Sequence, residues 1–193
     1  MIGIYIDIHT HHPTSATTIH TVGVHPWKAA MGVLPTEEEI AAAEAVGEIG
    51  LDKVCAVDFG RQKTVFNAQL DLAEQHEKPV VIHCVRAFEE VMRCLVAKNL
   101  PAVIFHGFIG SKEQAERALQ QGYHLSFGMR TGHSPKSIEA LRHTPFDRLF
   151  VESDEEMTPI ETIYETVAAW RGVPIEELCQ ATRTNYTRIF RKQ

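Results

Sequence analysis

Short apolar runs alternate with segments of helical periodicity along most of the chain. The runs that we expect to form strands are Ile4–Ile8, Ile19–Val24, Ala45–Ile49, Pro79–Cys84, Ala102–His106, Tyr123–Phe127 and Arg148–Ser153. Most of them are continuously apolar rather than alternating, which is typical of parallel strands covered by helices on both faces.

Between these runs, apolar residues recur at the spacing of one helix face. Two clear stripes are Phe66, Leu70 and Ala73, and then Phe88, Val91, Met92, Leu95 and Val96. Strands that alternate with helices predict an α/β fold with a parallel sheet. A length of 193 residues suits one well-buried core, so we expect a single domain over residues 1–193.

Composition places the chain among ordinary globular proteins, with 44% hydrophobic and 23% charged residues. No apolar run approaches the roughly 18 residues that cross a bilayer, so no membrane association is expected. The N-terminus lacks the basic and apolar regions of a secretory signal. The four cysteines form no CxxC pair, and reduced thiols in a cytoplasmic protein are the expectation.

The formal net charge of −6 argues against a sequence-independent binder of duplex DNA, which normally carries a basic surface. It leaves room for an enzyme that contacts a few phosphates through metal ions. The 11 histidines are the unusual feature of the composition, and their positions therefore matter.

In parallel α/β folds, chemistry gathers where strands end. The predicted strands end in residues of the types that bind divalent metals: His9, His11, Glu48, His83, His106 and Asp154. Side chains two residues apart in extended chain point the same way, so His9 and His11 can converge on one ion.

A lone histidine is more often a hydrogen-bonded core or surface residue than a ligand. On that ground we set aside His12, His20, His76, His124, His133 and His143. Taken alone, Glu48 could be a surface ion pair and Asp154 a helix N-cap. The shared position of all six candidates at strand ends favours a metal site.

Four imidazoles and two carboxylates exceed the four ligands of one zinc ion and fit two ions, with Glu48 able to bridge them. Such a site activates water and stabilises the attacking and leaving oxygens, which suits hydrolysis of phosphate esters. We expect Glu48 and Asp154 to be the catalytic carboxylates, with Asp154 orienting the water and collecting its proton. Asp7 is expected to support the ligands indirectly.

The same residues resemble the motifs of the TatD-type metal-dependent deoxyribonucleases over nearly the whole chain. The matching motifs are Asp7-Ile8-His9-Thr10-His11, Gly23-Val24-His25-Pro26, Gly47-Glu48-Ile49-Gly50-Leu51-Asp52, the strand ends at His83 and His106, and Asp147–Asp154. The Gly47–Asp52 motif is the most specific. This resemblance implies a TIM-like parallel β/α barrel that cleaves DNA or oligonucleotide ends.

The resemblance also implies roles for particular residues. One ion would be held by His9, His11, Glu48 and Asp154, and the other by Glu48, His83 and His106. His25 would face the substrate phosphate, and Glu152 would support the ligands around Asp154. The two divalent ions could be zinc, magnesium, manganese or nickel, since His and carboxylate ligands accept each of them.

The chain also departs from the family. The segment between His11 and Gly23 has room for little more than a loop and one strand, which implies a distorted or seven-stranded barrel. A homo-oligomer could cover the opened wall. Glu155 and Glu156 follow Asp154 where the family carries basic residues, and Arg86 is the best remaining cation for a phosphate.

Two other functions fit the same residues. An amidohydrolase-like enzyme or phosphoesterase would use the metals on a small-molecule ester, amide or phosphate. A non-catalytic metal-binding partner module would keep the metals without turnover. The Gly47–Asp52 motif and the single histidines at His83 and His106 favour phosphodiester hydrolysis over the first alternative. The intact set of candidate ligands argues against the second, because a site that has lost catalysis is usually free to decay.

Overall fold

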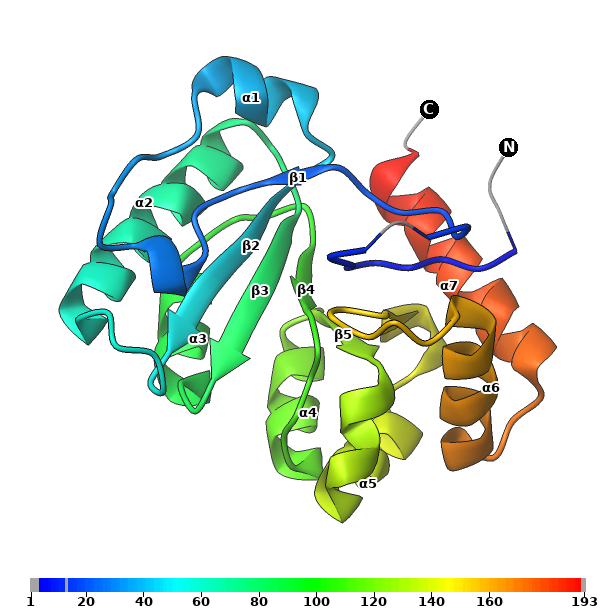
Figure 1. The fold of residues 1–193 in the computed structure, drawn as a ribbon. Coiled ribbons are helices and arrows are strands. Elements are labelled where there is room, and N and C mark those ends of the chain that lie inside the picture. Colours follow the sequence, from blue (N-terminus) through cyan, green and yellow to red (C-terminus); the bar gives the residue numbers. More distant parts are fainter. Residues whose placement is uncertain (1–3, 13, 192–193) are drawn as a thin grey trace. The chain divides into compact units, whose positions relative to one another are not determined.

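The structure, a computed structural model, describes residues 4–12 and 14–191 and divides the chain into two compact units. The central unit is the continuous segment 20–105. The terminal unit joins the start of the chain, up to Ile19, to everything from His106 onward. Figure 1 shows the ribbon of the chain.

Four parallel strands form the sheet of the central unit, and they are neighbours in their order along the chain. The elements of this unit are β1 (Thr21–Val22), the 3-10 turn η1 (Pro26–Lys28), α1 (Glu37–Ala42), β2 (Ala45–Asp52), α2 (Phe59–Gln75), β3 (Val80–Val85), α3 (Phe88–Leu95) and β4 (Val103–Phe105). In Figure 1, β2 and β3 run side by side, and α2 and α3 pack against them.

The predicted helix stripes explain this packing. Phe66, Leu70 and Ala73 are at most 1% exposed on the face of α2 that covers β2. The stripe of α3 is buried in the same way except at its end, because the helix stops at Leu95 and leaves Val96 57% exposed. Every residue of β2 is buried except Glu48, which is partly exposed. This burial agrees with the prediction of a parallel strand covered by helices.

In the terminal unit, β5 and β6 pair in parallel, and helices cover them. The elements are α4 (Lys112–Gln120), β5 (His124–Phe127), the 3-10 turn η2 (Met129–His133), α5 (Pro135–His143), the 3-10 turn η3 (Phe146–Arg148), β6 (Leu149–Val151), α6 (Ile160–Arg171) and α7 (Ile175–Phe190).

The first predicted strand, Ile4–Ile8, is not a strand in the structure. It forms only an isolated bridge between Ile6 and Thr17, and a second bridge joins Thr10 to Asp154. The physical reason is visible at Ile6, whose N–H and C=O bind the Tyr164 hydroxyl at 3.2 and 2.8 Å instead of a neighbouring strand. The segment nevertheless lies along the end of β6, where Ile8 N–H donates to the Val151 carbonyl at 3.1 Å.

A parallel β/α architecture is confirmed in both units, with six strands among the described residues. The segment between His11 and Gly23 is short as expected, since its described residues contain only the two-residue β1 and no helix. Closure into a barrel and the single domain stay predictions. Among the described helices, none is both long and apolar enough to cross a membrane.

Candidate metal centres

Three predicted residues of the central unit meet at β2 and β3. Glu48 and His83 lie inside these strands rather than at their ends as predicted, because the strands run on past them to Asp52 and Val85. The register pairs Gly50 with His83. The Oε1 atom of Glu48 lies 2.5 Å from His83 Nδ1 and 3.3 Å from His25 Nε2. One donor atom from each of the three side chains lies within 4.8 Å of the others. We call this set the central cluster.

Asp52, the last residue of β2, holds the opposite edge of the same imidazole. Its Oδ2 atom lies 3.2 Å from His83 Nε2 and accepts a hydrogen bond from Trp27 Nε1 at 2.7 Å. Burial opposes ionisation of Asp52, but the hydrogen bonds from Trp27, Val54 and His83 hold the pKa of its carboxyl below the usual value. The Nε2 atom of His83 therefore faces Asp52, and Nδ1 faces Glu48.

Two buried glutamines on α2 fix the turns that carry this cluster. Gln69 binds both backbone groups of Val24, accepting from N–H at 2.6 Å and donating to the carbonyl at 3.1 Å. Gln62 does the same for the backbone of Asp52, at 2.8 and 3.0 Å. The helix therefore positions both the turn before His25 and the end of β2.

His25 has a defined tautomer because its Nδ1 accepts the Trp27 backbone N–H at 3.2 Å. A neutral imidazole with that acceptor carries its proton on Nε2. This nitrogen is the one directed at Glu48 and at His83 Nδ1, which lies 3.2 Å away. His25 thus offers a hydrogen-bond donor to the central cluster rather than a metal-binding lone pair.

A second set of predicted residues meets in the terminal unit. Asp154 Oδ1 lies 3.7 Å from His9 Nε2 and 3.6 Å from His11 Nε2. Reciprocal backbone bonds explain the approach, because Asp154 N–H donates to the His9 carbonyl and His11 N–H donates to the Asp154 carbonyl. Asp154 adopts the left-handed backbone region (φ 54°), which non-glycine residues rarely occupy outside functional sites. We call these three residues the terminal cluster.

His106 stands beside this cluster. Its ring centroid lies 4.4 Å from that of His9, and its Nδ1 atom is 3.3 Å from Glu152 Oε1. His106, Glu152 and Asp154 also offer donor atoms within 4.8 Å of one another. Gly107 follows with φ 50°, and a Cβ atom there would lie 3.1 Å from Glu152 Oε1.

Asp7 is fully buried and reaches Asp154 only through the residue before it. Its carboxylate accepts the N–H of Ser153 at 2.9 Å and the hydroxyl of Ser153 at 2.7 Å. Burial raises the pKa of Asp7 to about 6, although both bonds from Ser153 oppose that shift. Asp7 therefore fixes the backbone at Ser153, directly before Asp154.

Two arginines flank the clusters. Arg86 is exposed directly after β3, in the left-handed backbone region (φ 52°). Arg130 was not among the predicted residues, and its Nη1 atom lies 3.9 Å from Asp154 Oδ2. Its position three residues after β5 is the same strand-end signal that identifies the histidines, and it could have been found in that way.

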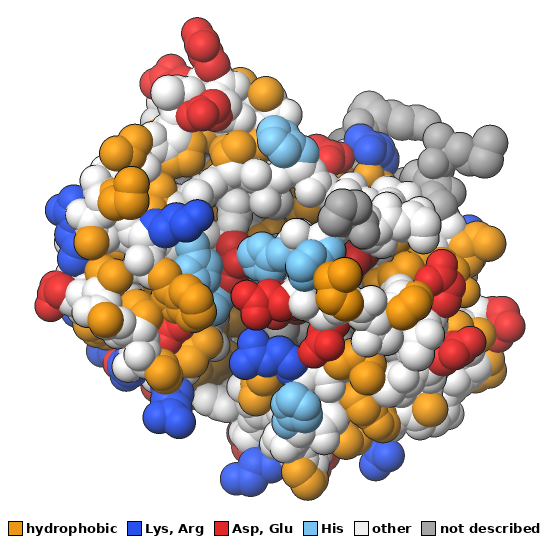
Figure 2. All heavy atoms as spheres, in the orientation of Figure 1, with side chains coloured by type: hydrophobic (Ala, Val, Ile, Leu, Met, Phe, Trp, Pro, Cys, Tyr) orange, Lys and Arg blue, Asp and Glu red, His pale blue; other side chains and the backbone are white. Residues whose placement is uncertain are grey.

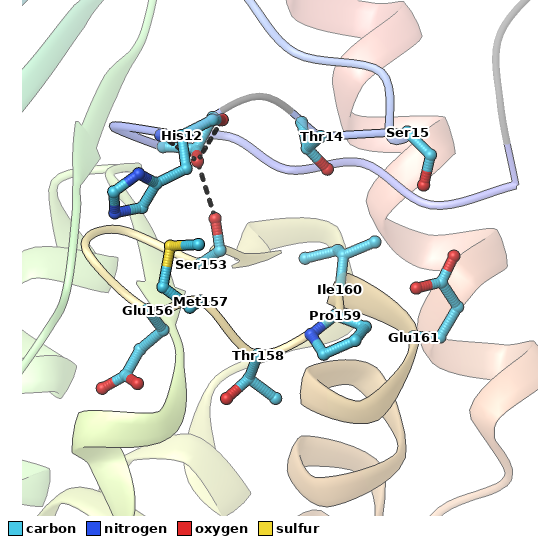
Figure 3. A pocket seen from close by; sticks show the side chains of 11 residues that line it. His12, Thr14, Ser15, Ser153, Glu156, Met157, Thr158, Pro159, Ile160 and Glu161 are labelled. Atoms are coloured by element: carbon cyan, nitrogen blue, oxygen red, sulfur yellow. Dashed lines mark hydrogen bonds between the residues drawn. The ribbon is translucent and has the colours of Figure 1, made fainter.

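A cavity of about 210 Å³ opens beside the terminal cluster. In Figure 3 it lies between the segment carrying His12, Thr14 and Ser15 and the segment from Ser153 to the start of α6. Hydroxyl groups and the carboxylates of Glu156 and Glu161 line it, together with apolar Met157, Pro159 and Ile160. Among the described residues that line it there is no lysine or arginine, so they offer a phosphate no permanent positive charge.

The donor sets fit divalent metals. Imidazole nitrogen and carboxylate oxygen are the ligands that zinc and its neighbours accept, at about 2.0–2.2 Å from the ion. The ligand atoms of the terminal cluster lie within 4.8 Å of one another, as do those of Glu48 and His83, so small side-chain movements would bring each set around one ion. Sequence reasoning missed Asp52 as a partner of His83, since only the tertiary contact reveals it.

Comparison with known proteins places these clusters in context. The family model described as TatD related DNase matches residues 7–191. The uncharacterized metal-dependent hydrolase YabD of Bacillus subtilis is 30% identical over 199 residues, which cover 88% of this chain and 76% of that protein. The 3'-5' ssDNA/RNA exonuclease TatD of Pectobacterium carotovorum is 30% identical over 203 residues, covering 89% and 77%.

Among solved structures, the TatD homologue YjjV of Escherichia coli has a TM-score of 0.80 at 24% sequence identity, with 100% of both chains covered. This likeness concerns the fold.

Proposed function

Because the chain belongs to the family of TatD-related DNases and is a metal-dependent hydrolase of that family, we propose that it removes nucleotides from the 3′ end of single-stranded DNA or RNA. The observation that carries this proposal is the meeting of histidines and carboxylates in each unit. The relatives named as exonucleases supply the polarity and the substrate class.

Each cluster would hold a divalent ion through its own side chains. In the terminal unit these are His9, His11 and Asp154, with His106 beside them. In the central unit they are Glu48 and His83. When bound, such ions supply a water whose pKa falls toward neutrality.

The chain's own residues have separate tasks in this reaction. Asp154 accepts the proton of the attacking water through its carboxylate. His25 donates Nε2–H to a phosphate oxygen, since its other nitrogen is occupied by the Trp27 N–H. Arg130, 58% exposed beside Asp154, attracts the negative phosphate, and Arg86 offers a second cation.

The reaction is a hydrolysis. The water oxygen forms a bond to phosphorus, and the bond between phosphorus and the 3′ oxygen of the preceding sugar breaks. That oxygen takes up a proton. The products are a nucleoside 5′-phosphate and a chain one nucleotide shorter with a free 3′ hydroxyl.

The test is hydrolysis of 5′-labelled single-stranded DNA and RNA by protein that has been stripped of metal and then reconstituted. We expect a ladder that shortens from the 3′ end only after a divalent metal is added. Glu48→Gln should abolish it, whereas Glu38→Gln, at an exposed position on α1, should not. A metal-loaded protein that cuts neither polymer would refute the proposal.

A second candidate is hydrolysis of a small phosphoester, and the acidic residues after Asp154 favour it. Glu156 and Glu161 line the cavity beside the terminal cluster, and Glu155 is exposed between them and Asp154. Like charges weaken the approach of a long polyanion. Metal-dependent turnover of bis(4-nitrophenyl) phosphate without any shortening of DNA or RNA would select this candidate.

A further inference from the structure

Trp27 is a large aromatic side chain that is 60% exposed and yet firmly held. Its Nε1–H donates to Asp52 Oδ2 at 2.7 Å, and its backbone N–H donates to His25 Nδ1 at 3.2 Å. The indole also meets the His25 ring edge to face, with 5.2 Å between centroids and 86° between planes. These contacts fix the ring while leaving much of its surface in water.

The ring lies next to the central cluster. Trp27 and His83 share one carboxylate oxygen, Asp52 Oδ2, at 2.7 and 3.2 Å. The His25 ring stands between them, with its centroid 4.4 Å from that of His83. An exposed apolar surface is thus fixed one side chain away from the residues that we assign to metal and phosphate.

Three basic residues belong to the segments next to this ring in the central unit. Lys28 follows Trp27 directly, and Arg61 donates to the Ala29 carbonyl at 3.2 Å. Lys53 follows Asp52 and pairs with Glu90 at 2.6 Å. The three consecutive glutamates of α1, by contrast, lie near the opposite end of β2, where Figure 2 shows acidic side chains gathered.

We propose that the exposed surface of Trp27 stacks on a nucleobase of a single-stranded nucleic acid whose phosphate is bound at the central cluster. Aromatic rings beside cations are the usual means by which proteins hold single strands without reading their sequence. The inference rests on the proposed function, because it assigns the organic part of that substrate. Removing one such stack lowers affinity about 5- to 150-fold.

The chain contains only two tryptophans, Trp27 and Trp170, so Trp170→Phe leaves Trp27 as the single fluorescent reporter. The protein carries its divalent metal, and phosphorothioate linkages in both probes slow hydrolysis during the titration. The probes are an oligothymidylate of ten nucleotides and an abasic oligomer of the same length and charge. We expect oligothymidylate to quench the fluorescence and the abasic oligomer to bind with much less quenching.

Three variants separate stacking from other roles. Trp27→Ala should weaken binding of oligothymidylate 5- to 150-fold and leave binding of the abasic oligomer nearly unchanged. Trp27→Phe keeps a ring but loses the bond to Asp52, so it should retain most of the preference for bases. Val54→Ala is the matched control, because Val54 is 62% exposed and its N–H binds the same Asp52.

Equal affinity for both oligomers, or unchanged binding in Trp27→Ala, would overturn the inference. Failure of the proposed function looks different, because base-dependent quenching would then persist while metal-loaded protein cut neither DNA nor RNA. Hydrolysis without base-dependent quenching would leave the proposed function standing and remove only the role of Trp27.

Discussion

Tyr164 anchors the segment that carries the first predicted ligands, and removing its hydroxyl should loosen that segment. The ring is fully buried on α6. Its hydroxyl accepts the Ile6 N–H at 3.2 Å and lies 2.8 Å from the Ile6 carbonyl and from Thr182 Oγ1. Tyr164→Phe keeps the ring and deletes only these bonds.

The cost follows from the groups left behind. Both backbone groups of Ile6 would stay buried without the hydroxyl, and each buried group that loses its partner costs about 1–3 kcal/mol. Partial relaxation of the backbone around Ile6 offsets part of this cost. Burial of a phenylalanine ring, which has no hydroxyl to desolvate, offsets a further part. We expect Tyr164→Phe to lower the free energy of unfolding by about 2–3 kcal/mol, which corresponds to a fall in Tm of roughly 4–12 °C for a chain of this size.

The assay is thermal unfolding together with hydrogen exchange of the amides from Ile6 to His11. Exchange of these amides should quicken more than exchange in α2, which lies in the other unit. Tyr5→Phe is the control, because its half-buried ring contacts Tyr164 at 5.1 Å and loses the same hydroxyl. A Tm for Tyr164→Phe within 1–2 °C of wild type, or equal to that of Tyr5→Phe, would refute the reasoning.

The remaining predictions concern the two clusters. Asp52→Asn should lower the affinity of the central unit for zinc about 10- to 100-fold, because the amide no longer holds His83 as a carboxylate does; competition with a chromogenic chelator measures it. Gly50→Ala should destabilise the protein by about 3 kcal/mol or more, since its Cβ would lie 1.9 Å from the His83 carbonyl oxygen, and yield of soluble protein with urea unfolding tests this. Arg130→Met should raise KM for phosphodiesters several-fold with little change in Tm. A marked fall in Tm together with the rise in KM would instead assign Arg130 a structural role. Removing metal should lower the unfolding free energy by about 2.7 kcal/mol relative to protein at a free metal concentration of 100 Kd, measured by chelator titration of Tm.

The candidate ligands were predictable from sequence because they lie in or directly after apolar runs, and parallel strands bring such residues to one region of a sheet. The strand ends themselves were not predictable, since β2 and β3 run on past Glu48 and His83 and the run before His9 forms no strand. The structure accordingly brings His9, His11 and Asp154 together within the terminal unit, and Glu48 and His83 within the central unit. Their roles as ligands stay predictions.

Other features depend on contacts between distant parts of the chain, which no local pattern encodes. Ile4–Ile8 alternates like a strand, but the Tyr164 hydroxyl, from a helix 158 residues away, takes the backbone groups of Ile6. The exposed surface of Trp27 depends equally on a distant acceptor, Asp52. Local sequence propensity predicts such elements, but contacts with distant residues determine whether they form.

The Gly47–Asp52 motif makes physical sense as a clamp on one imidazole. Glu48 and Asp52 are four residues apart on β2, and residues i and i+4 of a strand point to the same face. Because β3 runs parallel beside them, His83 receives Glu48 at Nδ1 and Asp52 at Nε2. Gly50, between the two carboxylates, leaves the space that the His83 carbonyl occupies. The strand β2 therefore supplies a candidate ligand in Glu48, the group that orients His83 in Asp52, and the space for the His83 carbonyl at Gly50. Substitution of any one of these three residues should disturb the positions of the other two.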